Sequence, residues 1–189
     1  MKVFIVHGSY GNPFVNWQPW LVEQLNSRGI TCTVPAFPTP EHQNYSDWKQ
    51  LLDYYYEMGI MTPDTVFIGH SAGSICIAKY LAEKNIKALG LITTAGYNNY
   101  LEDTSPMRKL NETFYTSDQS LKTLRNNIKY RYNIVGDNDP YIPAIHFEEL
   151  SKSIDAQMLI IKNGGHLNAR AGYTTFENLL EIIITMQEQ

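Results

Sequence analysis

Six short apolar runs alternate with longer amphipathic segments along the chain, and this alternation predicts strands and helices in turn. The runs are rich in Val, Ile and Leu, as expected of strands that are buried on both faces of a parallel sheet. We expect strands at Val3–Val6, Ile30–Val34, Thr65–Ile68, Ala88–Thr93, Tyr132–Val135 and Met158–Ile161. The predicted fold class is therefore α/β, a three-layer α/β/α sandwich with about six mostly parallel strands.

Between these runs, apolar residues three or four positions apart predict amphipathic helices. The segments are Asn16–Arg28, Ser46–Met58, the residues after Ser71 up to Lys84, the stretch that ends at Leu150, and Tyr173–Met186. The stretch from about 96 to 127 is instead polar, with short amphipathic pieces such as 107–114 and 121–128. We expect one domain, residues 1–189, in which this insertion forms either a small lid or an ordinary crossover helix with long flanks.

Charge and glycine spacing limit the partners and cofactors of the protein. The 15 basic and 19 acidic residues give a formal net charge of −4. This balance disfavours binding to a phosphate backbone, so we expect no nucleic-acid partner. The loop after the first strand holds Gly8 and Gly11 but no dinucleotide fingerprint, and the chain contains no P-loop. We expect no cofactor and no metal site.

Cysteine usage and the length of the apolar runs bear on where the protein acts. Cys32 and Cys76 are too few for a disulfide framework, and both are predicted to be buried free thiols. No apolar run reaches the roughly 20 residues of a membrane span, and the first run is too short for a secretory signal. We therefore expect a cytoplasmic protein without a membrane span.

The sequence Gly69-His70-Ser71-Ala72-Gly73 follows directly on the third apolar run and opens a helix-forming segment. In a strand–turn–helix setting, Gly-x-Ser-x-Gly makes a sharp turn that pushes the serine hydroxyl outward, and its glycines let strand and helix approach closely. Ser71 is the predicted nucleophile. The five-residue pattern is short enough to arise by chance, so the other strand ends must supply its partners.

A serine hydroxyl needs a base to remove its proton and an acid to orient that base. Of the five histidines, only His166 lies in a loop after the last strand, where Gly164 and Gly165 would let it swing over the sheet edge. The other four lie beside the elbow, in the first loop, in a proline-rich loop or inside a helix. Asp137 and Asp139 both follow the fifth strand, and either could be the acid. The chain order Ser, Asp, His is that of serine hydrolases built on open parallel sheets.

Acyl transfer also needs hydrogen-bond donors for the oxyanion that develops on the carbonyl oxygen. The backbone N–H of Ala72, directly after the nucleophile, is one expected donor. The second is expected from the loop after the first strand. Ser9 is the first choice there and Tyr10 the second.

With these residues placed, the whole chain resembles the α/β-hydrolase-fold serine hydrolases of the retinoblastoma-binding-protein-9-like (YdeN-like) family. The resemblance is carried by His7-Gly8, Trp17 to Leu21, the proline-rich Pro35 to Pro40, the Ser71 elbow, Gly136 to Pro143 and Gly165-His166. It implies that Ser71, Asp139 and His166 form the triad, with Asp139 rather than Asp137 as the acid. It also implies a minimal sheet, in the order 2-1-3-4-5-6, without the first two antiparallel strands of larger relatives.

These observations predict a serine hydrolase that cleaves a carboxylic ester, or less readily a thioester or amide, of a small substrate through an acyl-enzyme at Ser71. Few and short loops favour a shallow site and a small acyl group. Two alternatives remain open. One is a hydrolase-fold binding protein with an idle triad and a protein partner, and the other is an acyltransferase that uses an alcohol acceptor.

Overall fold

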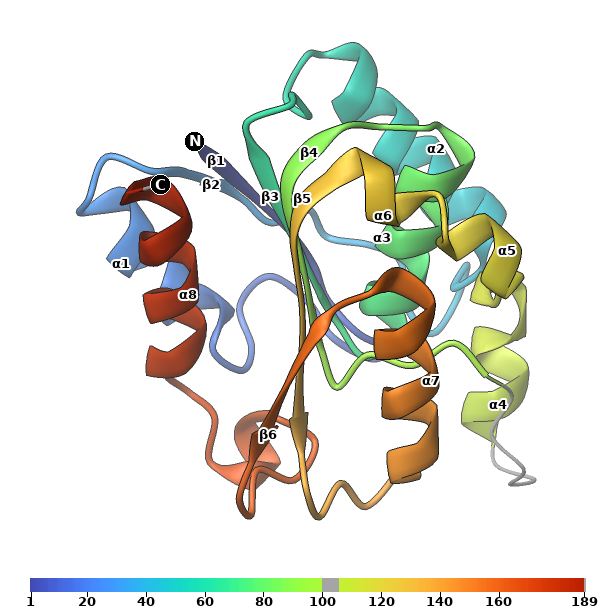
Figure 1. Ribbon diagram of the computed structural model, residues 1–189. Coiled ribbons are helices and arrows are strands. Elements are labelled where there is room, and N and C mark those ends of the chain that lie inside the picture. Colours follow the sequence, from blue (N-terminus) through green and yellow to red (C-terminus); the bar gives the residue numbers. More distant parts are fainter. Residues whose placement is uncertain (100–105, 189) are drawn as a thin grey trace.

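Parallel strands form one sheet in the order β2-β1-β3-β4-β5-β6 (Figure 1). The computed structural model describes residues 1–99 and 106–188. Its strands are β1 (Lys2–Val6), β2 (Thr31–Thr33), β3 (Thr65–His70), β4 (Ala88–Thr94), β5 (Ile128–Gly136) and β6 (Gln157–Ile161). The predicted α/β class and the strand order are both confirmed.

Two layers of helices cover the two faces of the sheet (Figure 1). One face is covered by α1 (Gln18–Asn26) and α8 (Glu177–Glu188). The other is covered by α2 (Tyr45–Glu57), α3 (Ala72–Glu83), α5 (Asp118–Leu121), α6 (Leu124–Asn127) and α7 (Ala144–Ile154). The short helix α4 (Pro106–Asn111) lies on the same side and packs on the 3₁₀ turn at Glu112–Phe114. A second 3₁₀ turn, Ala169–Ala171, precedes α8. The predicted three-layer sandwich is present.

Alternation along β1 explains why its residues are apolar on both sides. Val3 and Ile5 pack into the core under α1 and α8, whereas Phe4 and Val6 pack into the core under α2 and α3. All four side chains are at most 1% exposed. Burying a side chain of this size stabilises the fold by roughly 1.5–3 kcal/mol, so a continuous apolar run is the pattern that a central parallel strand needs.

The strand β5 begins at Ile128, four residues before the predicted start at Tyr132. Its first half pairs with β4, starting with Ala88 opposite Ile128, whereas β6 begins only opposite Tyr132. Lys129 in this half is exposed. The exposed and partly buried residues of this half lack the continuous apolar run of the central strands, so the sequence did not indicate a strand here. The predicted piece 121–128 is instead divided among α5, α6 and the start of β5.

The last helix also begins later than predicted, at Glu177 rather than Tyr173. Asn168 accepts a hydrogen bond from the backbone N–H of Ala171 and so caps the 3₁₀ turn there. Gly172 then takes a left-handed conformation, with φ 91°, that redirects the chain. Phe176 still packs in the core against Trp17, which is why the apolar periodicity extended beyond the helix.

The two cysteines differ in burial. Cys76 is fully buried in α3, as predicted, but Cys32 in the edge strand β2 is only partly buried. Burial raises the pKa of the Cys32 thiol to about 12, and it also raises the pKa of Cys76. Both thiols are therefore protonated at neutral pH. Among the described residues, no helix is long and apolar enough to cross a membrane.

Candidate active site

Ser71 lies between β3 and α3 in a backbone conformation that is rare for a residue with a side chain. Its φ is 53° and its ψ is −121°. Such a conformation costs of order 1–3 kcal/mol and persists only where surrounding contacts enforce it. Here the Ser71 N–H donates to the carbonyl of Thr94 at 2.9 Å, and the Ser71 carbonyl accepts from the N–H of Ser74 at 2.9 Å. The strand–turn–helix setting predicted for the elbow is present.

The two glycines of the elbow are needed because backbone segments touch there. A Cβ atom on Gly73 would lie 2.2 Å from the carbonyl oxygen of Val6, and one on Gly69 would lie 2.4 Å from the Cα of Ser74. Both contacts are with backbone, which cannot rotate away as a side chain can. The strand β1 and the helix α3 therefore approach each other at a distance that only glycine allows.

We expect Gly73→Ala to lower the free energy of unfolding by about 3 kcal/mol or more, because overpacking against backbone displaces whole elements. Urea denaturation followed by circular dichroism measures this change. Gly29→Ala is the matched control, since Gly29 has φ 72° but no heavy atom within 4 Å of an added Cβ. It should lose only about 1–2 kcal/mol, from the left-handed backbone. Equal losses in the two variants would contradict the steric argument.

His166 and Asp139 are joined directly. The His166 Nδ1–H donates to Asp139 Oδ2 at 2.7 Å, and the Asp139 side chain is only 1% exposed. The other carboxylate oxygen of Asp139 accepts the backbone N–H groups of Tyr141 and Ile142, at 2.9 and 3.1 Å. The carboxylate is therefore fixed on both sides, and the His166 ring keeps Nε2 as the nitrogen that can accept a proton.

The neighbouring residues Asp137 and Asn138 hold the loop that carries His166. The side chain of Asp137 accepts the N–H of Asn163 at 2.7 Å, and the side chain of Asn138 accepts the N–H of Gly165 at 2.7 Å. Asp137 is exposed and does not contact His166 through a hydrogen bond. Of the two candidate acids, the geometry favours Asp139. Asn138 was not predicted, although its place between two acidic residues at a strand end could have suggested it.

The glycines before His166 pack closely against the end of β5, and the swinging motion expected from the sequence stays a prediction. Gly164 and Gly165 are both buried. A Cβ atom on Gly136, at the end of β5, would lie only 2.2 Å from the Gly165 carbonyl oxygen. The loop after β6 therefore lies directly on the end of β5, and His166 is held in place.

His7 and His70 are buried, neutral and structural. His70 Nε2–H donates to the backbone carbonyl of His166 at 3.0 Å, and burial followed by the charge of His166 lowers the pKa of His70 to about 3. His7 Nδ1–H donates to the Gly8 carbonyl at 2.9 Å, while its Nε2 accepts the N–H of Phe37 at 2.9 Å. Burial lowers the pKa of His7. The two rings shape the loops on either side of Ser71.

A cavity of about 730 Å³ opens at this end of the sheet, and both Ser71 and His166 line it. Its walls come from the loop after β1, the elbow, the segment after β4, the loop after β5 and the loop after β6. Within the described residues no hydrogen bond joins the Ser71 hydroxyl to the His166 ring, and such contacts often tighten only with substrate bound. The carboxyl ends of parallel strands are the usual place for a site in this architecture.

A sequence model of the serine hydrolase family matches residues 3–184, which is nearly the whole chain. The chain belongs to the serine hydrolase family. It is therefore a hydrolase of the α/β-hydrolase fold, as the sequence predicted.

Relatives of this serine hydrolase support the predicted branch of the family. It is 21% identical to serine hydrolase RBBP9 from Rattus norvegicus over 188 residues, 98% of this chain and 95% of the relative. The structure of the ydeN gene product from B. subtilis covers 100% of this chain and 99% of its own, with a TM-score of 0.88 and 23% identity. The predicted RBBP9-like, YdeN-like membership is confirmed.

The fold of this serine hydrolase is also found in another hydrolase structure. A meta-cleavage product hydrolase from Pseudomonas fluorescens aligns over 100% of this chain and 90% of its own, with a TM-score of 0.76 and 12% identity. At this identity the match supports the fold alone, and fold kinship does not define a substrate.

The loop after β1 of the serine hydrolase distinguishes the two candidate oxyanion donors. The N–H of Tyr10 is already used, because it donates to the Thr39 hydroxyl at 2.8 Å. The backbone of Ser9 has no such bond among the described residues, and Ser9 lines the cavity. Ala72 is the first residue of α3, where backbone N–H groups have no partner within the helix. The geometry therefore favours Ser9 over Tyr10 as the partner of Ala72.

A buried polar cluster fixes Ser9. Its hydroxyl donates to the Asn111 side-chain oxygen at 2.9 Å and accepts from the Gln43 amide at 2.6 Å. The same Gln43 amide donates to Asn111 at 2.6 Å, and the Asn111 amide donates to the Tyr97 hydroxyl at 3.2 Å. Asn111 is 1% exposed and Gln43 is 6% exposed. Neither residue was predicted from the sequence, because a single amide in a loop or short helix carries no local pattern.

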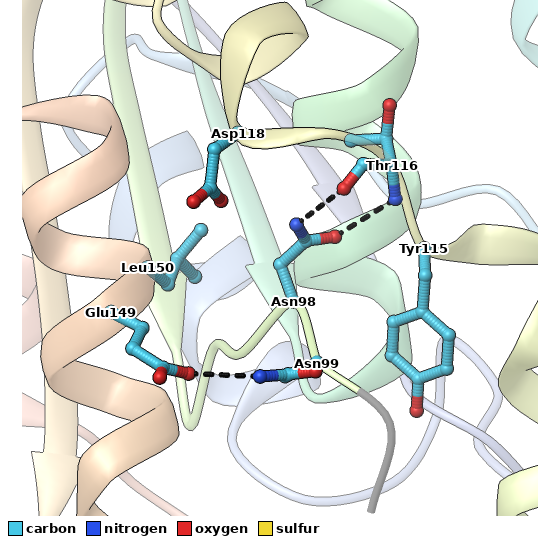
Figure 2. Close-up of a pocket in the computed structure, with 7 residues that line it drawn as sticks. All are labelled: Asn98, Asn99, Tyr115, Thr116, Asp118, Glu149 and Leu150. Carbon is cyan, nitrogen blue, oxygen red and sulfur yellow. Dashed lines mark hydrogen bonds between the residues drawn. The ribbon is translucent and has the colours of Figure 1, made fainter.

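The described part of the 96–127 insertion packs on the domain. Figure 2 shows a second cavity, of about 310 Å³, between this segment and α7. Beside it the Asn98 side chain donates to the Thr116 carbonyl at 2.7 Å and accepts the Thr116 N–H at 3.0 Å, while Asn99 donates to Glu149 at 3.0 Å. Residues 100–105, part of the predicted lid, lie outside the described residues. Motion of the insertion as a lid stays a prediction.

The residues that the structure describes contain no group of three or more His, Cys, Asp and Glu side chains that could hold a metal ion. The acidic and imidazole groups at the strand ends are instead used in pairs and in bonds to the backbone, as Asp139 and His166 are. The site brings together a hydroxyl, an imidazole, a carboxylate and backbone N–H groups.

Proposed function

We propose that this serine hydrolase cleaves a carboxylic ester of a small substrate through an acyl-enzyme at Ser71. The observation that carries the proposal is the 2.7 Å bond between His166 Nδ1 and the buried Asp139 carboxylate, in the cavity that Ser71 lines. An imidazole held in this way has one nitrogen committed to the acid and the other available as a base. A thioester or an amide would use the same groups.

In the first half of the reaction, His166 Nε2 takes the proton of the Ser71 hydroxyl as the oxygen attacks the substrate carbonyl carbon. The negative charge that develops on the carbonyl oxygen is stabilised by the backbone N–H groups of Ala72 and Ser9. Asp139 stabilises the imidazolium and keeps its proton on Nδ1 in the correct orientation. The proton on Nε2 then passes to the leaving alcohol, and the acyl group remains on Ser71.

In the second half, His166 removes a proton from water, and the hydroxide attacks the acyl carbon. The tetrahedral intermediate uses the same two N–H donors. When it collapses, the proton returns from His166 to the Ser71 oxygen, and the free acid leaves. An alcohol in place of water would give a new ester. The triad can activate either acceptor, so it does not by itself determine which of the two reacts.

The cavity supports a wider range of acyl groups than the shallow site expected from the sequence. Its volume of about 730 Å³ lies within the range of about 300–1,000 Å³ of typical ligand pockets. Apolar or aromatic walls come from Val15, Tyr97, Met107 and Ile142. We therefore propose an acyl group with apolar character.

A screen of p-nitrophenyl esters with graded acyl chains, run beside labelling with a fluorophosphonate probe, tests the proposal. We expect turnover of these activated esters and stoichiometric labelling of the protein. Labelling without turnover of any ester would point to a different acyl bond, such as an amide. If the protein shows no turnover and is not labelled, the alternative of a binding protein with an idle triad is supported.

We expect Asn111→Leu to lower kcat about 10-fold with little change in KM. The substitution removes the acceptor of the Ser9 hydroxyl and lets the oxyanion loop shift, and complete loss of one oxyanion donor typically costs about 10²- to 10³-fold. Steady-state kinetics with a p-nitrophenyl ester measures the change. Lys109→Ala, an exposed position in the same helix α4, is the matched control. If Asn111→Leu lowers stability but leaves kcat unchanged, the cluster has only a structural role.

A further inference from the structure

Among the described residues, one side chain with a permanent charge lines the active-site cavity. Among the residues that line the cavity, Arg170 alone is Asp, Glu, Lys or Arg. The lining residue His70 is neutral at pH 7, because its burial lowers its pKa to about 3. The protein has a formal net charge of −4, so the described lining of the cavity has the opposite sign to the whole molecule.

The charge of Arg170 has no partner among residues 1–99 and 106–188. Its guanidinium forms no hydrogen bond and no ion pair with any described residue, whereas Arg125 donates to backbone carbonyls at the end of α7 and Arg131 pairs with Asp155. A guanidinium that supports the fold is normally found with carbonyls or carboxylates in this way. Arg170 therefore has all of its donors available to a molecule in the cavity.

The backbone that carries Arg170 is anchored on both sides. The Ala169 N–H donates to the Asn16 side chain at 2.9 Å, and the Asn168 side chain accepts the Ala171 N–H at 3.2 Å. The indole N–H of Trp17 donates to the Leu167 carbonyl at 3.1 Å. Because the base of the side chain is fixed before any ligand arrives, ordering it costs less on binding.

The position of Arg170 relative to the base indicates which part of a substrate it meets. Arg170 follows His166 in the same loop, whereas the apolar Tyr97 and Met107 come from the segment after β4. In acyl transfer the base delivers its proton to the leaving group, so the leaving group lies on the side of the base. The apolar walls are then left for the acyl group.

We propose that Arg170 forms an anion subsite and that the natural substrate is an ester whose leaving alcohol carries a carboxylate or phosphate group. This assignment rests on the proposed ester hydrolysis at Ser71. A guanidinium matches both anions with paired N–H donors. Arg170 is exposed, so the interaction is screened by water and contributes about 5-fold in kcat/KM at low ionic strength.

The test compares 4-butyryloxybenzoate with its neutral methyl ester, which has the same acyl group. We divide kcat/KM for the carboxylate ester by kcat/KM for the methyl ester. We expect this ratio to fall about 5-fold in Arg170→Gln, to fall further in Arg170→Glu, and to stay unchanged in Arg28→Gln. The intrinsic reactivities of the two esters differ, but this difference is the same in every protein and cancels when the ratios of wild type and variant are compared. Arg28 is a suitable control because it is exposed at the end of α1, bonded only to Gln24 and Ser27, and outside the cavity lining.

Two further arms separate the sources of the anion. The butyryl ester of 4-hydroxyphenyl phosphate replaces the carboxylate by a phosphate, and the larger drop in Arg170→Gln identifies the preferred group. p-Nitrophenyl hemiglutarate, compared with p-nitrophenyl pentanoate, places the carboxylate on the acyl side. If the charge preference depends on Arg170 only for this acyl pair, the assignment to the leaving group is wrong.

Failure of this inference is distinguishable from failure of the proposed function. Turnover of the neutral ester with a ratio that is the same in wild type, Arg170→Gln and Arg170→Glu would overturn the anion subsite and leave the hydrolase intact. An equal loss for both esters in Arg170→Gln would also overturn it, because it would indicate a structural role. If no ester is turned over, titration with 4-hydroxybenzoate still tests the subsite, since its Kd should rise about 5-fold in Arg170→Gln and an unchanged Kd contradicts it.

Discussion

Ser71→Ala is expected to lower the turnover of a p-nitrophenyl ester about 10⁶-fold, because the substitution removes the oxygen that forms the acyl-enzyme. The left-handed elbow should survive, since its hydrogen bonds to Thr94 and Ser74 use backbone atoms only. Steady-state kinetics measures the loss, and labelling with a fluorophosphonate probe should disappear with it. An unchanged circular dichroism spectrum would show that the fold is retained.

Ser74→Ala is the matched control for the nucleophile. Ser74 lies one turn further along α3, is fully buried, does not line the cavity, and donates its hydroxyl to the Thr94 carbonyl at 3.4 Å. We expect this variant to keep its probe labelling. Turnover by Ser71→Ala within about 100-fold of the wild type would show that another group attacks the carbonyl carbon.

Asp139→Asn is expected to lower turnover about 10⁴-fold, by analogy with the same change in other triads. An amide can turn its NH₂ group toward Nδ1, which would place the ring proton on Nε2 and remove the base. The substitution also removes the negative charge that stabilises the imidazolium. The measurement is kcat with a p-nitrophenyl ester across a range of pH. The range distinguishes a shift of the pH dependence of kcat from a loss of activity at every pH.

Asp137→Asn provides the comparison, because it is the same substitution two residues earlier. An asparagine there still offers an oxygen to the Asn163 N–H, so the loop after β6 should stay in place. We expect a loss of less than about 10-fold, since only an exposed charge is removed. A larger loss in Asp137→Asn than in Asp139→Asn would reverse the assignment of the acid.

The sequence predicted those parts of the fold and site that depend on local pattern. The central strands β1, β3 and β4 consist mainly of apolar residues because both of their faces are covered, and their ends were located to within two residues. The residues proposed for chemistry all follow strand ends, where a parallel sheet gathers them. The resemblance to a known family supplied the strand order and the preference for Asp139.

Other parts depend on contacts between distant residues and have no local signature. The start of β5 could not be predicted because its first half is not a continuous apolar run, and β6 pairs with β5 only from Tyr132 onward. Gln43 and Asn111 are 68 positions apart and meet only when the proline-rich loop and α4 pack beside the loop after β1. The choice between Ser9 and Tyr10 likewise depended on Thr39, whose bond to the Tyr10 N–H no spacing rule indicates.

The attachment of the loop after β6 to the end of β5 constrains insertions and deletions. Three consecutive residues, Asp137, Asn138 and Asp139, bond to Asn163, Gly165 and His166. Adding or removing one residue between β6 and His166 would always shift His166 relative to Asp139, and before Asn163 it would shift all three partners, so repacking of side chains could not restore all three bonds. Among active relatives, the length of this segment should therefore vary less than its composition. A library of variants that randomises the residues of this segment should retain function far more often than a library that changes the number of residues in it.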